Sequence, residues 1–127
     1  MEKIFAEISA GELVDKITIL EIKKAKISNE EKLEDINKEL ESLKQTFKKF
    51  IPDDSTIKNN MDRLKNINAK LWDIEDGKRE LEKKQDFSEK FVELARNVYK
   101  FNDQRAKIKL EINKALGSNI KEIKSYE

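Results

Sequence analysis

Apolar residues recur every three or four positions over four long stretches of the chain, which is the period of an amphipathic α-helix. The pattern predicts helices over residues 10–27, 29–50, 56–84 and 87–116. In the first stretch apolar residues occupy most of the helix circumference, which indicates a helix at the centre of a bundle. In the second stretch the spacing alternates strictly between three and four residues, as in the seam of a coiled coil, at Leu33, Ile36, Leu40, Leu43, Phe47 and Phe50.

Signals for helix ends lie between these stretches. Ser9 and Glu12 have the spacing of a capping box, in which the serine side chain accepts from a backbone amide of the first turn. Pro52 ends the second helix, and Gly117 suits a left-handed C-cap. Short connections make consecutive helices antiparallel neighbours. The sequence therefore predicts an all-α fold in a single domain, residues 1–127. It is an antiparallel four-helix bundle with two long C-terminal helices that project as a hairpin, and with short extended arms at both termini.

Composition narrows the classes of function. Charged residues make up 42% of the 127 positions, but 27 basic and 26 acidic residues leave a net charge of only +1. A nucleic-acid or membrane-surface partner would require a basic excess, so neither is expected. The chain has no His and no Cys, which excludes imidazole acid–base chemistry, thiol nucleophiles and structural zinc sites. No apolar run approaches the roughly 20 residues that cross a bilayer, and the N-terminus lacks the apolar core of a signal peptide, so a cytoplasmic location is expected.

One charged residue interrupts the apolar stripe of the last predicted helix. Arg105 follows Phe101 and precedes Ile108 in this row, where an aliphatic residue would be expected, and Asn102 and Asp103 lie beside it. A guanidinium stays charged in proteins, so it needs a partner, a ligand or water. Two interpretations stay open, namely a buried polar layer that sets helix register and a pocket for an anion or a phosphate. The possible partners of Arg105 in a register-setting salt bridge are Glu12 and Asp15 of the first predicted helix and Glu75 and Asp76 of the third.

A second polar group lies on the third predicted helix. Trp72, Glu75, Asp76 and Arg79 follow one another at the spacing that places side chains along one helix face. They form either a ligand wall with two carboxylates that could hold a magnesium ion, or a tryptophan at the core margin beside charges that pair in solvent.

A third polar group opens the first predicted helix. Glu12 and Asp15 are three positions apart, which is a spacing found in carboxylate-bridged metal sites, and Lys16 follows them. Acidic residues in a first turn also complement the helix dipole without any further role. Both interpretations stay open.

Three blocks of sequence form a distinctive combination. They are residues 8–23 with Lys26-Ile27, the run Leu-Trp-Asp-Ile-Glu-Asp at residues 71–76, and residues 91–126, which include Asn102-Asp-Gln-Arg105 and Leu116-Gly-Ser118. In this combination the chain resembles a family of small uncharacterised bacterial all-helical proteins, a domain of unknown function. The resemblance covers nearly the whole chain and implies a helical fold, but it implies no activity. Apart from Arg79, all three polar groups lie within the similar blocks.

These features favour a non-enzymatic structural or protein-interaction module without a cofactor, which self-associates as a homodimer through apolar helix surface. The alternative is a Mg²⁺-dependent enzyme or a binder of nucleotides or other phosphorylated small molecules. Glu12-x-x-Asp15 before an apolar helix is loosely similar to a metal-binding pair of all-helical nucleoside triphosphate pyrophosphatases, although no E-x-x-E pair precedes it. The candidate ligand-binding residues are Arg105, Asn102, Asp103, Trp72 and Lys16, and the candidate metal ligands are Glu12, Asp15, Glu75 and Asp76.

Overall fold

Four α-helices make up the fold in the computed structural model, which describes residues 1–119. They are α1 (Ala10–Lys26), α2 (Glu30–Phe50), α3 (Ser55–Lys83) and α4 (Glu89–Leu116), and no strand occurs in this part of the chain. The all-α prediction is confirmed, and each predicted helix end lies within two residues of the observed one. Residues 1–9 belong to no helix or strand, which agrees with an N-terminal arm, whereas the predicted C-terminal arm lies largely outside the described residues.

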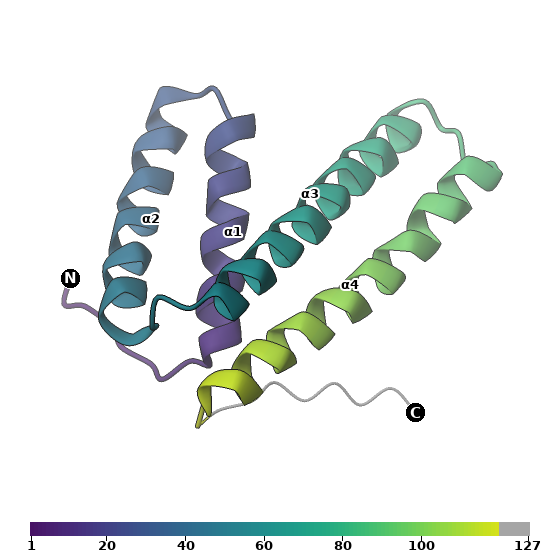
Figure 1. Ribbon diagram of the computed structural model, residues 1–127. Helices are drawn as coiled ribbons and strands as arrows, with labels where there is room; N and C mark the ends of the chain where they lie inside the picture. Colours follow the sequence, from purple (N-terminus) through teal and green to yellow (C-terminus); the bar gives the residue numbers. More distant parts are fainter. Residues whose placement is uncertain (120–127) are drawn as a thin grey trace.

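The helices form two antiparallel hairpins that splay apart, as Figure 1 shows. The α1–α2 hairpin lies across one end of the longer α3–α4 hairpin, and the other end of α3–α4 projects away from it, as the helix lengths predicted. Helix α1 packs against all three other helices, whereas α2 packs closely against α1 alone. The central position predicted for the first helix is therefore confirmed.

Two apolar clusters explain why apolar residues surround most of α1. One side of α1 packs on α2, and the cluster there contains Leu13, Ile17, Leu20, Ile36 and Leu40. Another side packs on α3 and α4, and this cluster contains Val14, Ile57, Leu64, Ile67, Ile108 and Ile112. The seam of α2 faces a single helix, so Ile36 and Leu40 are buried but Phe50 remains 68% exposed.

The N-terminus of α1 is joined tightly to the C-terminus of α4. Gly11 lies so close to α4 that an added Cβ atom would overlap the Lys109 carbonyl oxygen and lie 2.9 Å from Asn113 Oδ1. The Gly11 amide donates to Asn113 Oδ1 at 2.7 Å, and the Ala10 amide donates to Ser118 Oγ at 3.0 Å. Ser9 Oγ accepts from the Glu12 amide, as the capping box predicted. Side chains therefore satisfy first-turn amides that a helix leaves without partners.

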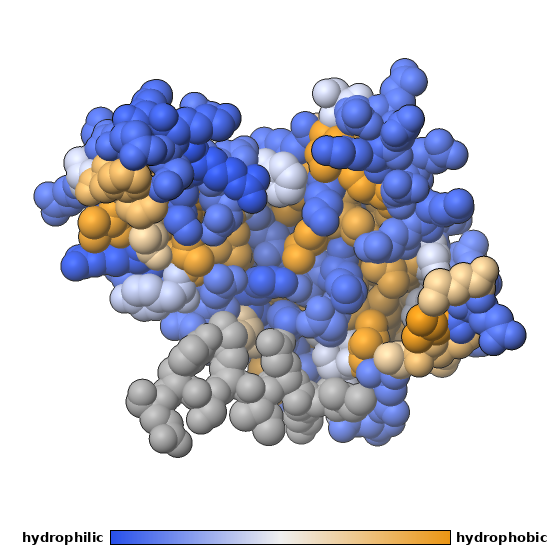
Figure 2. All heavy atoms as spheres, turned by 180° about the vertical axis from the view of Figure 1, so that it is seen from behind, coloured by the Kyte–Doolittle hydropathy of each residue, from blue (hydrophilic) through white to orange (hydrophobic). Residues whose placement is uncertain are grey.

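The projecting end of the α3–α4 hairpin differs from the crossed end. No residue from 75 to 107 is buried, and Phe87 and Tyr99 are more than half exposed. In Figure 2 apolar side chains reach the surface here among charged ones, on the left of the view. At the hairpin turn, hydrogen bonds from the Ser88 side chain and backbone hold the pKa of Asp86 below its ordinary value. No helix within residues 1–119 is long and apolar enough to pass through a bilayer.

Candidate functional site

Asp15 and Arg105 form a bidentate ion pair where α1 crosses α4. Arg105 Nε donates to Asp15 Oδ1 at 2.9 Å, and Arg105 Nη2 donates to Asp15 Oδ2. The Asp15 side chain is completely buried, whereas the Arg105 side chain is 28% exposed. The planar guanidinium matches both carboxylate oxygens, so Asp15 fixes the orientation of Arg105 from the inside.

Neutral polar groups complete the surroundings of the buried carboxylate. Asn68 Nδ2 on α3 donates to both Asp15 Oδ1 and Thr18 Oγ1, at 2.9 Å each. The Thr18 hydroxyl in turn donates to the Asp15 backbone carbonyl at 2.8 Å. A buried carboxylate without such partners would strongly destabilise the fold. The observed bonds join α1, α3 and α4 at one place.

A second ion pair extends this network towards the start of α1. The Lys109 side chain is 7% exposed, and its Nζ lies 2.7 Å from Glu12 Oε2 and 4.0 Å from Asp15 Oδ2. Within residues 1–119, two carboxylates of α1 and two cations of α4 thus meet in the network. These pairs across the two helices favour the interpretation of a polar layer that sets the register between α1 and α4.

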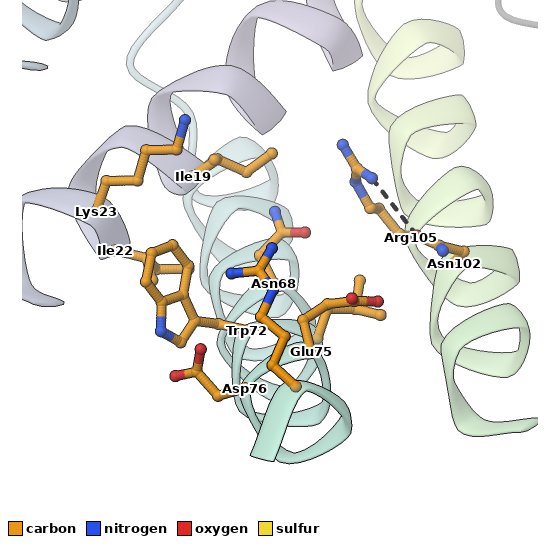
Figure 3. Close-up of a pocket in the computed structure, with 11 residues that line it drawn as sticks. Ile19, Ile22, Lys23, Asn68, Trp72, Glu75, Asp76, Asn102 and Arg105 are labelled. Atoms are coloured by element: carbon orange, nitrogen blue, oxygen red, sulfur yellow. Dashed lines mark hydrogen bonds between the residues drawn. The ribbon is translucent and has the colours of Figure 1, made fainter. Parts of the chain in front are cut away.

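A cleft of about 320 Å³ opens beside this network, between α1, α3 and α4. Arg105 extends into it from α4 towards α1, and Trp72 extends from α3 towards Ile22 and Lys23 of α1, as Figure 3 shows. The cleft volume lies at the lower end of the roughly 300–1,000 Å³ typical of small-molecule sites. Its other lining residues are Ile19, Asn68, Leu71, Glu75, Asp76, Arg79 and Asn102.

Arg105 belongs to both the network and the cleft. Its Nη1 also lies 3.5 Å from Asn102 Oδ1, a long hydrogen bond that orients the amide of Asn102 beside the cleft. The two interpretations of Arg105 were a structural ion pair and a residue of a pocket. The structure shows both features, because one edge of the guanidinium binds a buried carboxylate and the side chain lines an open cleft.

The predicted ligand-binding residues divide into two sets. Arg105, Asn102 and Trp72 line the cleft, as do Glu75, Asp76 and Arg79 from the predicted wall of the third helix. Lys16 and Asp103 are exposed and do not line it. Lys16 follows the buried Asp15, and Asp103 follows Asn102, which lines the cleft. A step of one position turns a side chain by about 100° around a helix.

The four predicted metal ligands do not come together. Glu12 and Asp15 bind Lys109 and Arg105, while Glu75 and Asp76 line the cleft. Within residues 1–119 no three acidic side chains are close enough to one another to hold a metal ion. The i, i+3 spacing of Glu12 and Asp15 instead places both carboxylates opposite the cations of α4.

Asn68 is the main site residue that the sequence interpretation missed. It lies four positions after Leu64 and three before Leu71, so it interrupts an apolar row of α3 as Arg105 interrupts that of α4. It is 6% exposed, and its amide hydrogens bind Asp15 and Thr18. Within residues 1–119 no donor forms a hydrogen bond to its Oδ1, and Asn68 is one of the residues that line the cleft.

A comparison with known protein families identifies the family of this chain. The model described as "Family of unknown function (DUF6165)" matches residues 4–127. The chain belongs to this family. The match confirms the resemblance inferred from the three sequence blocks, and it assigns no activity to the DUF6165 fold; the bacterial origin stays an expectation. No curated protein and no solved structure matches the chain.

Proposed function

We propose that this DUF6165 protein is a non-enzymatic binding module whose binding site is the cleft between α1, α3 and α4. The observation that carries the proposal is the position of Arg105, which is held by a buried carboxylate and lines an open cleft opposite Trp72. A binding site is most effective when its side chains are fixed before the ligand arrives, because less conformational entropy is then lost.

The composition of the cleft supports binding rather than catalysis. It combines apolar side chains and an indole with a few convergent polar groups, which is the usual character of small-molecule sites. The chain contains no His or Cys. Of the carboxylates near Arg105, Asp15 is fully buried and bound to it, so Asp15 has no access to a proton or a nucleophile of a bound molecule.

Nuclear magnetic resonance with a fragment library tests this function. The library contains neutral, anionic, cationic and zwitterionic fragments, so the test does not depend on the class of ligand. We expect amide shift changes in ¹⁵N-labelled protein to concentrate at residues that line the cleft, such as Ile22, Trp72 and Asn102. Fragments that bind elsewhere, or no fragment binding at all, would contradict the proposal.

Two controls sharpen the result. Trp72→Ala removes the aromatic wall and should abolish the shift changes, whereas Asp73→Ala changes the adjacent exposed residue, which does not line the cleft, and should preserve them. A titration with Mg²⁺ tests the alternative of a magnesium-dependent protein. Fragment binding that requires Mg²⁺ would replace the present proposal with that alternative.

A further inference from the structure

We infer that the ligand of the cleft is a small zwitterion, in which an ammonium group and an acidic group belong to one molecule; this inference rests on the proposed function. The inference follows from the distribution of charge along the cleft. Side chains of both signs line it, and several of them do not neutralise one another.

One face of α3 offers groups that bind a cation. Asn68, Trp72, Glu75 and Asp76 lie on this face, and they supply a carbonyl oxygen, an indole ring and two carboxylates. Glu75 forms an ion pair with Lys78, in which Lys78 Nζ lies 3.6 Å from Glu75 Oε1. Asp76 forms no ion pair within the described chain. An aromatic face beside a carboxylate is suited to an ammonium group through cation–π attraction and charge. Figure 3 shows the carboxylate of Asp76 beside the indole of Trp72.

Two cations of the cleft are suited to the acidic end of the same ligand. Lys23 lies across the cleft on α1, and Arg79 follows Asp76 by three positions on α3. Neither Lys23 nor Arg79 forms an ion pair with any carboxylate of residues 1–119. In particular, neither forms an ion pair with Asp76, so charges of both signs line the cleft without a partner among residues 1–119.

A purely anionic or purely cationic ligand would lie beside lining charges of its own sign. A zwitterion can place each of its charges beside a lining charge of the opposite sign. The charge of Arg105 does not alter this balance, because Asp15 already compensates it. The small volume of the cleft further favours a compact molecule with both groups close together.

Fluorescence of the single tryptophan provides the test, because Trp72 is the only tryptophan of the chain and lines the cleft. The probes are O-phosphoethanolamine and β-alanine as zwitterions, ethanolamine as the cation alone, and inorganic phosphate as the anion alone. We expect the dissociation constant of at least one zwitterion to be about tenfold or more below that of either single charge. Vesicles that contain phosphatidylethanolamine distinguish a lipid head group from the free molecule, because only the former source predicts co-sedimentation of the protein.

Surface variants locate the two ends of the ligand. Asp76→Asn should weaken zwitterion binding about tenfold without affecting any weak phosphate binding, and Lys23→Gln should weaken zwitterion binding without affecting ethanolamine. Asp73→Asn and Lys24→Gln are the matched controls, because these exposed neighbours do not line the cleft and should leave binding unchanged.

The possible failures are distinct. If phosphate alone or ethanolamine alone binds as tightly as the zwitterions, the zwitterion inference is overturned while the binding function of the cleft stands. If no probe changes the fluorescence, the inference is also overturned, and the fragment experiment decides separately whether the cleft binds other molecules.

Discussion

The two ends of the α3–α4 hairpin contain similar sequences of apolar and charged residues but have different interiors. At the end crossed by α1, the hairpin buries Leu64, Ile108 and Ile112 together with the polar residues Asn68 and Lys109. At the projecting end, from residue 75 to residue 107, no side chain is buried. The two ends differ because α1 packs against the hairpin at one end only.

Two packed helices contact each other along one face only, so two helices alone cannot enclose a charged group on all sides. Helix α1 supplies the third side, and it also supplies the carboxylate of Asp15 that makes a charge on the apolar stripe of α4 tolerable. The candidate site lies just where the coverage by α1 ends. There Arg105 is held from within by Asp15 and still lines the cleft.

The largest expected effect comes from Asp15 at the crossed end. Asp15→Ala removes the buried carboxylate that binds both Arg105 and Asn68, and removal of one partner of a buried ion pair typically costs about 3–5 kcal/mol. Because the Arg105 side chain is 28% exposed and can recover some hydration, we expect a loss of about 3 kcal/mol in the free energy of unfolding. Urea denaturation followed by circular dichroism measures it.

The matched control for Asp15 is Asp76, an exposed carboxylate nearer the projecting end. Asp76→Ala should change the free energy of unfolding by no more than about 0.5 kcal/mol, as is usual for surface positions. Equal effects of the two variants would show that burial by α1 does not distinguish the two ends.

A pair of glycines gives the next effect in size. In Gly11→Ala the new methyl group overlaps the backbone of α4 at Lys109, so the two helices must separate. Overpacking of this kind costs about 1–3 kcal/mol, and the shift also lengthens the bond between the Gly11 amide and Asn113. We expect the midpoint of thermal unfolding to fall, as measured by differential scanning calorimetry.

Gly77→Ala makes the corresponding change at the projecting end. Its methyl group would lie 3.1 Å from Leu94 Cδ1, the end of a half-buried side chain that can move aside. The better helix propensity of alanine is worth about 1 kcal/mol, so we expect little loss of stability or a small gain. A loss as large as that of Gly11→Ala would contradict the view that the projecting end is loosely packed.

The sequence alone predicts all four helices but only part of the candidate site. The helical period of apolar residues is a strong signal, and Arg105 was detectable because a charge on an apolar row is conspicuous. The sequence alone indicates Asp15 only as one of four possible partners, with Glu12, Glu75 and Asp76, because acidic residues are common in the first turn of any helix. The spacing of Glu12 and Asp15 fits a metal site and a pair of salt bridges equally well, and only the position of α4 distinguishes the two.

Neighbouring residues show a further limit of sequence interpretation. Lys16 and Asp103 were grouped with the site because they adjoin Asp15 and Asn102, but a single position changes which way a helical side chain points. Asn68 was overlooked because a neutral amide is less conspicuous on an apolar row than a charge. The same rule that revealed Arg105 would reveal Asn68 if amides were included in it.

The smallest expected effect concerns self-association, which remains a prediction. Phe87 and Tyr99 are 52% and 58% exposed at the projecting end, where α1 does not cover the hairpin. A second copy of the chain could supply the missing cover, since burial of apolar surface favours association. We expect weak, concentration-dependent dimerisation in sedimentation velocity experiments.

Two sets of variants test which surface is involved. The double variant Phe87→Ser with Tyr99→Ser should weaken dimerisation about tenfold. Phe50→Ser, which removes an exposed aromatic residue of α2, should not weaken it. A chain that stays monomeric at the highest soluble concentration would contradict the prediction of self-association and would show that the projecting end stays uncovered in solution.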